Sequence, residues 1–368
     1  MIKRQEPIRK DIIRISALLV ALVVLMSFLL TMMMSSKITV RAFTPTPMPP
    51  KTVHGQSTSA RAMSTIDMQT GRVFYEHNAD AKLPLASTTK IVTAITVIEE
   101  FERTGRSLDE KFTIHDKSIG IEGTSIYLQK GESMTARELL LGLMLRSGND
   151  AGQALAFAVA PSIAEFATLM NQTAQKAGAT NSSFKNPHGL DEEGHYTTAR
   201  DLAKISAYAM RNATFAEIVK TTEARIDGVE YPRVIQNKNR LLKSLDGCVG
   251  IKTGFTKKSG RCYVSALNTN GQTTICVVLN CGPMFEEAQA LMIAASHQFP
   301  MRKLVTAEEF IKFTEGCESG TCAIAIEDFY YPLADVELET RISITLEGEE
   351  VVIKLDGKEI YRAQCNVV

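Results

Sequence analysis

Three short motifs carry the residue types that serine-based acyl transfer requires. They are Ser87-Thr-Thr-Lys90, Ser147-Gly-Asn149 and Lys252-Thr-Gly254, and they occur in this order along the chain. A serine hydroxyl is a weak nucleophile at neutral pH, so a positioned base must take its proton. The first motif supplies that pair, the second a hydroxyl and an amide, and the third a cation and a hydroxyl. Together they predict a site that forms a covalent intermediate on a serine.

The Ser-x-x-Lys pattern occurs twice, and only one match lies in a helical context. After Ser87 the sequence TTKIVTAITVIEEF places apolar residues three and four positions apart, which predicts a helix with one buried stripe. Ser87 and Lys90 would then lie one turn apart on the same face, at the N-terminal end of that helix. Ser182 and Lys185 lie instead in GATNSSFKNPHG, a run of turn-forming residues that predicts a loop. The predicted stripe consists of Ile91, Ile95, Ile98 and Phe101.

The Lys-[Ser/Thr]-Gly pattern also occurs twice. Apolar residues alternate with polar or small ones up to Lys252, which predicts a half-buried strand. The second match, Lys258-Ser-Gly260, follows directly and is typical of the turn that leads into a next strand at 262–266. A glycine at position 254 would also let a ligand backbone approach the strand edge closely.

Ser87 is the predicted nucleophile, and Lys90 is its predicted base. A lysine can act as a base only when its ammonium form is destabilised, and both burial and a nearby like charge have that effect. The developing oxyanion needs backbone N–H donors, for which we expect those of Ser87 and Phe255.

The remaining motif residues have chemistry suited to a peptide substrate. Ser147 could pass a proton to a leaving amine, and the amide of Asn149 could hold a substrate carbonyl. Lys252 and Thr253 can bind a terminal carboxylate by charge and hydrogen bond. Each residue taken singly also has a structural explanation, such as a turn for Asn149, and their joint occurrence favours the chemical one.

From Ala60 to about Phe299 the chain resembles the serine-type D-Ala-D-Ala carboxypeptidases, the low-molecular-mass penicillin-binding proteins of peptidase family S11. The resemblance rests on IDMQTGRVFYEHNAD, LPLASTTKIVTAI, LLLGLMLRSGNDA, NPHGLDEEGHYTTARDLA and GIKTGFTKKSGRC. It implies an α/β (α+β) fold of the β-lactamase/transpeptidase type, with an antiparallel sheet flanked by helices. It also implies two partners, peptidoglycan stem peptides ending in D-Ala-D-Ala and β-lactam antibiotics, and no cofactor.

The resemblance assigns roles to the motif residues by position. It makes Ser87 the acyl-ester nucleophile and Lys90 the general base. Ser147 and Asn149 form the second motif, and 252–254 the third.

The chain departs from the family pattern where the substrate carboxylate would bind. Phe255 stands where relatives often have a histidine after the third motif, and the segment CGPMFEEAQ at 281–289 lacks the arginine that many relatives carry. A basic residue usually precedes the third motif. Here Lys238 and Arg240 both qualify.

His188 and His195 lie seven residues apart among acidic residues. A zinc site usually takes three or four ligands with regular spacing, which this segment lacks. The resemblance makes both histidines structural, and we expect no metal.

The N-terminal region predicts export. Residues 15–34 are uncharged and long enough to span a bilayer, and basic residues in 1–14 favour a cytoplasmic N-terminus. This is either an uncleaved anchor, giving a single-pass protein of the cell membrane with an extracytoplasmic catalytic domain, or a signal peptide cleaved near Ala42, giving a secreted protein. Residues 35–59, rich in proline and threonine, form a predicted linker.

The rest of the chain divides into a peptidase domain at 60–302 and a small β-rich accessory domain at 303–368. The second has alternating apolar residues broken by Glu-Gly and Asp-Gly turns. A net charge of +0 and a pI near 7.0 give no indication of nucleic-acid binding.

All the cysteines lie in the C-terminal third. Cys317 and Cys322 are the best local candidates for a disulfide in an exported protein. Cys262 and Cys276 fit buried, reduced thiols in strands. A further hypothesis is that oxidation of Cys248, four residues before Lys252, changes the activity. The complete set is Cys248, Cys262, Cys276, Cys281, Cys317, Cys322 and Cys365.

Three other functions compete with the carboxypeptidase. A class A β-lactamase shares the three motifs but needs a further carboxylate for deacylation, and Glu192 and Glu193 do not fit its pattern. A D,D-endopeptidase would use the same residues on a bulkier substrate. A catalytically idle wall-binding protein is disfavoured because every motif residue is intact.

Overall fold

A computed structural model describes residues 58–227, 232–307, 310–312, 322–325 and 327–367. The predicted membrane segment at 15–34 and nearly all of the linker lie outside these residues. The chain divides into two compact units. The larger comprises Met48–Leu304 with Tyr330–Leu338, and the smaller includes Val305–Phe329 and Glu339–Val368.

The larger unit is built on a five-stranded antiparallel sheet in the order β2-β1-β9-β8-β7. The strand that carries the third motif, β7, therefore forms one edge of the sheet. The strands are β1 (Ala62–Asp67), β2 (Val73–His77), β7 (Cys248–Thr256), β8 (Gly260–Thr269) and β9 (Gln272–Leu279).

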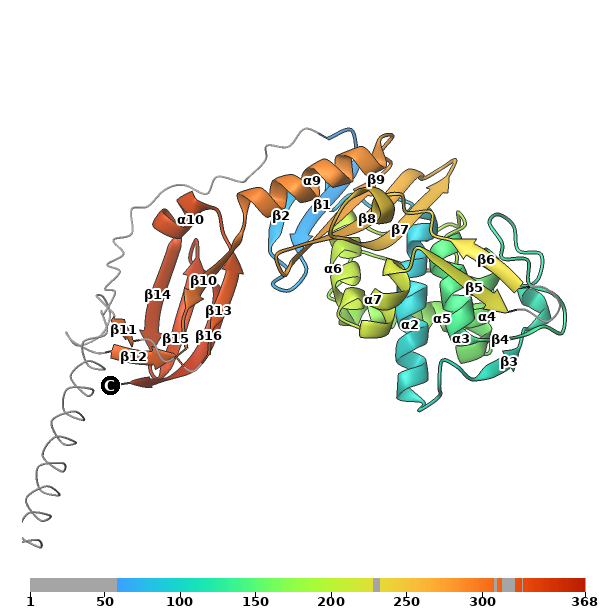
Figure 1. Cartoon of the computed structure of the whole chain (residues 1–368), viewed down its shortest axis with the longest axis horizontal. Helices are drawn as coiled ribbons and strands as arrows, with labels where there is room; N and C mark the ends of the chain where they lie inside the picture. The colour runs from blue at the N-terminus through green and yellow to red at the C-terminus, as the bar shows by residue number, and fades with distance from the viewer. Residues whose placement is uncertain (1–57, 228–231, 308–309, 313–321, 326, 368) are drawn as a thin grey trace, which may run out of the picture. The chain divides into compact units, whose positions relative to one another are not determined.

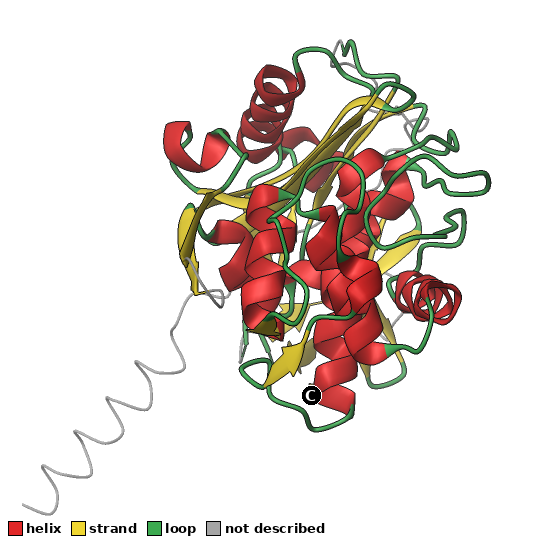
Figure 2. Ribbon diagram, turned by 90° about the vertical axis from the view of Figure 1, so that its right-hand side faces the viewer, coloured by secondary structure: helices red, strands yellow, loops and turns green. Residues whose placement is uncertain are grey.

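Alternating side chains cover the two faces of this sheet. In β9, Ile275 and Val277 pack into the core under the helical layer, whereas Cys276 and Val278 face the other side. That other side is covered by α9 (Met284–Gln298), as Figure 1 shows. Seen from the side in Figure 2, the unit has helices on both faces of its strands. Such alternation is what a strand buried on both faces by helices produces.

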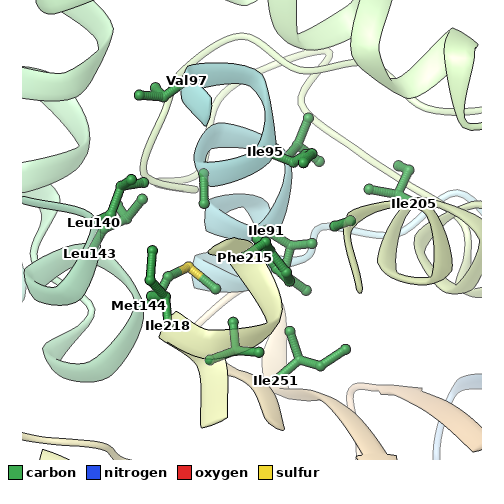
Figure 3. Packing of buried hydrophobic residues seen from close by; sticks show 14 of the residues in the cluster. Ile91, Ile95, Val97, Leu140, Leu143, Met144, Ile205, Phe215, Ile218 and Ile251 are labelled. Carbon is green, nitrogen blue, oxygen red and sulfur yellow. The ribbon is translucent and has the colours of Figure 1, made fainter. Parts of the chain in front are cut away.

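The helical layer surrounds α2 (Lys90–Arg103), the helix that follows Ser87 (Figure 3). The neighbouring helices begin at polar caps; Thr135, for instance, forms a capping box with Glu138 at the start of α3. The layer also contains α3 (Ala136–Leu141), α4 (Asn149–Val159), α5 (Ile163–Lys176), α6 (Ala199–Met210) and α7 (Ala213–Lys220).

The predicted single stripe on α2 is too narrow. The four stripe residues are buried, but so is every residue from Lys90 to Ile98. The helix packs against other helices and against β7. Spacing of apolar residues predicted the helix correctly but not its central position, because the buried residues also include Lys90 and two threonines, Thr93 and Thr96.

Short elements complete the larger unit. The turn η1 (Ala86–Thr89) precedes α2, and the π-helical turn η3 (Gly142–Arg146) precedes the second motif. The others are β3 (Lys111–Thr113), η2 (Asp116–Ser118), β4 (Ser133–Thr135), β5 (Glu223–Asp227), β6 (Pro232–Gln236), α8 (Leu241–Ser244) and β10 (Met301–Val305).

The smaller unit contains a second antiparallel sheet, in the order β11-β12-β16-β15-β14. The Glu-Gly and Asp-Gly pairs form its turns, with Gly348 and Gly357 at positive φ. Its strands are β11 (Phe310–Lys312), β12 (Cys322–Ala325), β14 (Ile342–Glu347), β15 (Glu350–Leu355) and β16 (Lys358–Val367). The boundaries between the two units fall within β13 (Phe329–Pro332) and α10 (Asp335–Thr340). The predicted fold class is confirmed: helices flank an antiparallel sheet, and a small β sheet follows.

No single helix in the described part of the chain has the length and apolarity to cross a bilayer. The pair α4 and α5 passes on length and composition together, but it is bent by 89°.

The central position of α2 predicts a large stability loss on truncation of its core residues. We expect Ile95→Ala to lower the free energy of unfolding by about 2–5 kcal/mol, because Ile95 is fully buried and its cavity cannot collapse easily. Denaturant unfolding measures this. Val73→Ala, at a 40% exposed position, serves as the control and should cost less than about 1 kcal/mol. An equal loss in the two variants would contradict the packing.

Candidate active site

Ser87 lies in a tight turn, and Lys90 returns to it from the start of α2. The turn η1 leaves Ala86 at φ +48°, and Thr88 donates its hydroxyl proton to Leu85 O at 2.6 Å. The Nζ atom of Lys90 then lies 2.9 Å from Ser87 Oγ. The predicted one-turn pairing is present, although its first turn is 3₁₀ rather than α.

Two further oxygen atoms contact the Lys90 amine. Nζ lies 2.7 Å from Asn149 Oδ1 and 2.7 Å from the His188 carbonyl oxygen. The side chain is fully buried, and this burial, followed by the charges of Lys252 and Lys238, holds its pKa well below the ordinary value of a lysine. A neutral amine has two N–H groups and one lone pair. Donation to Asn149 and His188 leaves that lone pair facing the Ser87 hydroxyl.

The second motif follows the π-helical turn. Ser147 adopts the left-handed conformation, with φ +70°, and is 4% exposed. Asn149 begins α4 and is fixed on two sides, since its backbone N donates to Thr124 O at 2.7 Å and its Nδ2 to Glu122 O at 2.6 Å. These two hydrogen bonds turn its Oδ1 toward Lys90. The sequence had predicted a contact of this amide with substrate but not the contact with Lys90.

Asp150 is a residue that the motif search missed. Its buried carboxylate accepts hydrogen bonds from Ile126 N at 3.0 Å, Leu128 N at 3.1 Å and the Ser125 hydroxyl at 2.5 Å. It therefore holds the loop that carries Thr124 against the start of α4. The only sequence signal for Asp150 was its position directly after the second motif. An acidic residue in the first turn of a helix is common and would not by itself indicate a role in the site.

The loop around His188 presses on the Ser87 turn from the other side. Gly189 has φ +84°, and a Cβ atom there would lie 1.9 Å from Ala86 O. Only glycine fits this approach. His195 contacts Thr89 Oγ1 through Nε2 at 2.9 Å and accepts from Lys185 N through Nδ1 at 3.0 Å.

Burial keeps both histidines neutral. It lowers the pKa of His188 to about 3 and that of His195 to about 4. The ring of His188 accepts a hydrogen bond from Leu190 N through Nδ1 at 3.3 Å. Across the described part of the chain, no group of three or more His, Cys, Asp or Glu side chains is arranged to hold a metal ion.

The second Ser-x-x-Lys match lies in a loop, as predicted. Ser182 Oγ donates to Asp201 Oδ2 at 2.8 Å and lies 2.8 Å from Thr197 Oγ1. Lys258 likewise lies in the turn between β7 and β8, so the interpretation of both second matches is confirmed.

The third motif lies on the edge strand β7, beside Ser87. Lys252 is 1% exposed, and burial together with the charge of Lys238 lowers its pKa to about 7. A Cβ atom at Gly254 would lie 3.0 Å from the backbone N atoms of Ser87 and Thr88. Phe255 follows, with a side chain that is 65% exposed. The geometry brings the backbone of β7 against the Ser87 turn; the roles of Thr253 and of the Phe255 N–H stay predictions.

Lys238 and Arg240 point to different surroundings. Lys238 reaches Thr124 Oγ1 at 3.4 Å, and its charge acts on both site lysines. Arg240 pairs with Glu286 at 3.1 Å, and its guanidinium lies 4.4 Å from the centre of the Phe285 ring, on the α9 side of the sheet. Of the two candidates, Lys238 is the one placed near the site.

Five of the cysteines fall within the described side chains, and all five are free: Cys248, Cys262, Cys276, Cys281 and Cys365. Cys262 and Cys276 are buried reduced thiols in strands, as one interpretation held. The proposed Cys317–Cys322 disulfide stays a prediction because Cys317 and the Cys322 side chain lie outside the described residues.

Comparison with known proteins relates the chain to one family. The family model described as D-alanyl-D-alanine carboxypeptidase, Peptidase S11, matches residues 49–282. D-alanyl-D-alanine carboxypeptidase DacF of Bacillus subtilis is 29% identical over 81% of this chain and 82% of its own length. DacC of Escherichia coli is 34% identical over 66% of this chain and 62% of its own.

Solved structures show the same fold. The D-alanyl-D-alanine carboxypeptidase DacD of Francisella tularensis superposes with a TM-score of 0.71 at 23% identity, covering 87% of this chain and 96% of that one. The DD-transpeptidase of Streptomyces K15 gives a TM-score of 0.60 at 31% identity, covering 66% of this chain and 98% of its own. These matches confirm the resemblance on which the fold prediction rested.

The low pKa of Lys252 predicts a pH dependence of stability. Between about pH 7 and its ordinary pKa of 10.5, the unfolded chain holds a proton on Lys252 that the folded protein lacks. The free energy of unfolding therefore rises with pH in that range, by up to about 1.4 kcal/mol per pH unit for one proton. Denaturant unfolding at about pH 6.5 and about pH 8.5 should show a larger gain in the unmodified protein than in Lys252→Met. Equal gains would contradict the lowered pKa of this lysine.

Proposed function

Since this chain belongs to the D-alanyl-D-alanine carboxypeptidase family, we propose that it is a serine-type D,D-carboxypeptidase. It removes the terminal D-alanine of peptidoglycan stem pentapeptides through an acyl-enzyme on Ser87. The observation that carries the proposal is the fully buried amine of Lys90, 2.9 Å from the Ser87 hydroxyl oxygen. A neutral amine so placed is the base that a serine nucleophile requires.

In the acylation step, Ser87 Oγ attacks the carbonyl carbon of the penultimate D-alanine, and its proton passes to Lys90 Nζ. The carbonyl oxygen becomes an oxyanion between the backbone N–H groups of Ser87 and Phe255. Close packing of Gly254 on the Ser87 turn supports this placement. As the tetrahedral intermediate collapses, the C–N bond breaks and the amine of the terminal D-alanine takes a proton by way of the Ser147 hydroxyl.

Deacylation repeats these steps with water as the nucleophile. Lys90, neutral again, accepts the proton of the attacking water, and Ser87 Oγ leaves with a proton. An amine acceptor in place of water would give transpeptidation, the activity in the name of the Streptomyces K15 relative. The same acyl-enzyme serves both outcomes, so the measured acceptor distinguishes them.

The terminal carboxylate of the substrate would bind to Lys252 and Thr253. Lys238 supplies a second positive charge nearby, which supports its role in a chain whose 281–289 segment has no arginine. The Oδ1 atom of Asn149 contacts Lys90, so the predicted hydrogen bond to a substrate carbonyl would come from its Nδ2 group, which has a second N–H besides the one donated to Glu122 O.

Placement outside the cytoplasm is part of the proposal. The uncharged segment 15–34 supports it, either as a single-pass anchor in the cell membrane or as a signal peptide cleaved near Ala42. Such a location would bring the catalytic domain to the peptidoglycan. The same site would be acylated by β-lactam antibiotics.

The rival functions have less support. An idle wall-binding protein has no need of a buried lysine beside a serine hydroxyl. A class A β-lactamase needs a further carboxylate for deacylation, whereas the Lys90 amine contacts a hydroxyl, an amide oxygen and a backbone carbonyl oxygen. A D,D-endopeptidase would use the same residues and differ only in substrate.

Release of D-alanine from a stem pentapeptide tests the function. We expect turnover by the unmodified protein and by Ser182→Ala, and a loss of at least about 10³-fold in Ser87→Ala, because the nucleophile is removed. A fluorescent penicillin should label the same proteins covalently. Labelling that survives Ser87→Ala would overturn the site, and penicillin turnover without D-alanine release would favour the β-lactamase.

The contact between Gly254 and the Ser87 turn predicts a steric effect on acylation. An added methyl group in Gly254→Ala would lie 3.0 Å from two backbone N atoms and separate β7 from the turn. We expect the rate of labelling by fluorescent penicillin to fall at least about tenfold, equivalent to about 1.4 kcal/mol. Gly282→Ala is the matched control, because nothing lies within 4 Å of its added Cβ. An unchanged rate in Gly254→Ala would contradict the proposed oxyanion site.

A further inference from the structure

A chain of buried polar side chains links the segment that carries Lys238 to the strand that carries Lys252. Asn239 Oδ1 accepts the hydroxyl proton of Tyr263 at 2.5 Å, and Tyr263 Oη lies 3.0 Å from Ser265 Oγ. Ser265 Oγ lies in turn 3.1 Å from the carbonyl oxygen of Gly250, two residues before Lys252. Tyr263 and Ser265 are 0% exposed and Asn239 is 2% exposed.

The protons in this chain of contacts can be assigned. Tyr263 gives its proton to Asn239, so Ser265 has one proton for two acceptors, Tyr263 Oη and Gly250 O. The thiol of Cys248, 3.6 Å from Gly250 O, can donate to that carbonyl when Ser265 donates to Tyr263. Each oxygen then has a donor, which is what a buried polar group needs to avoid a large desolvation cost.

The orientation of the Asn239 amide is fixed by two donors. Its Oδ1 accepts from Tyr263 and also from Leu241 N at 3.1 Å. The Nδ2 group is buried without a hydrogen-bond partner among the described atoms. Such a group costs free energy, so the amide is held where it is by what its oxygen does.

Lys238 lies between two anchored asparagines. Asn237 donates through Nδ2 to Thr221 O at 2.9 Å and accepts from Asn239 N at 2.9 Å. The Tyr263–Asn239 hydrogen bond holds the other end of this short segment. Between them, Lys238 extends to Thr124 Oγ1 at 3.4 Å, and its charge contributes to the lowered pKa of Lys252.

We propose that Tyr263 and Asn239 are positioning residues for substrate binding: their hydrogen bond ties the segment that carries Lys238 to the strands β7 and β8 beside the third motif, so that the side chains of Lys238 and Lys252 meet the terminal carboxylate together. The proposal rests on the proposed carboxypeptidase function of the site. Neither residue touches the substrate. They act through Lys238, whose long side chain would otherwise lose conformational freedom on every binding event.

A pair of peptides separates this role from a structural one. The first is a stem pentapeptide ending in D-Ala-D-Ala, and the second is the same peptide with its C-terminal carboxylate converted to an amide. We expect Tyr263→Phe to lower kcat/KM for the acid about tenfold, through KM rather than kcat. The amide should keep its kcat/KM within about twofold, because it lacks the carboxylate that Lys238 would bind. The tenfold loss for the acid corresponds to about 1.4 kcal/mol of carboxylate binding.

Tyr75→Phe is the matched control. Tyr75 is buried in the same apolar cluster as Tyr263, and its hydroxyl donates to Gln298 Oε1 at 2.7 Å. Both variants lose one hydroxyl from the same layer, so thermal unfolding should shift similarly in the two. Only Tyr263→Phe should change the ratio of acid to amide turnover. A parallel fall for acid and amide, or an unchanged ratio, would overturn the positioning role.

A double-mutant cycle tests the connection through Lys238. Lys238→Gln alone should lower the acid-to-amide ratio, and Tyr263→Phe added to it should lower the ratio no further. Additive losses would contradict the mechanism. If the unmodified protein releases no D-alanine, the proposed function fails instead. In that case the positioning role can still be tested with a penicillin and its methyl ester, which lacks the free carboxylate. For each variant, the ratio of the two acylation rates replaces the ratio of acid to amide turnover.

Discussion

The exclusion of water from one lysine amine is the constraint on which the site depends. A charged ammonium transferred to a protein interior costs far more than a neutral amine, so a fully buried lysine gives up its proton. Lys90 meets this condition because α2 is buried along its first nine residues and lies between other helices and the sheet. The helix that fills the core is therefore also what lowers the pKa of Lys90, as the proposed role of its amine as a base requires.

Two lysines in one site must divide the protons unequally. The charge of Lys252 helps to lower the pKa of Lys90, whereas burial and Lys238 account for the lowered pKa of Lys252. The proposed chemistry therefore uses the two lysines differently: Lys252, in its charged form, attracts a carboxylate, and Lys90, in its neutral form, accepts a proton from serine. A bound carboxylate strengthens this division because it stabilises the charged form of the lysine it contacts.

The sequence predicts the site best where its parts are local. Ser87 and Lys90 are three residues apart on one helical turn, so spacing alone pairs them, and strand alternation places Lys252 correctly. The contacts that complete the site come from elsewhere: the His188 carbonyl, the Asp150 carboxylate that holds a loop, and the choice of Lys238 over Arg240. These depend on how distant loops meet, and a backbone carbonyl gives no signature in residue types. The second unit was predictable for the same local reason, since its strands are joined by short turns.

The backbone, more than the side chains, holds the reacting groups in place, and this accounts for the departure at position 255. Gly189 and Gly254 approach the Ser87 turn so closely that a Cβ atom at either would meet backbone atoms of that turn. An oxyanion site made of N–H groups needs such close approach, and it uses nothing of the side chain that follows. Phe255 is 65% exposed and can replace the histidine of relatives, because only its N–H takes part in the proposed chemistry. The identity of this residue is thus free to change with the substrate beyond the scissile bond, while Gly254 is not.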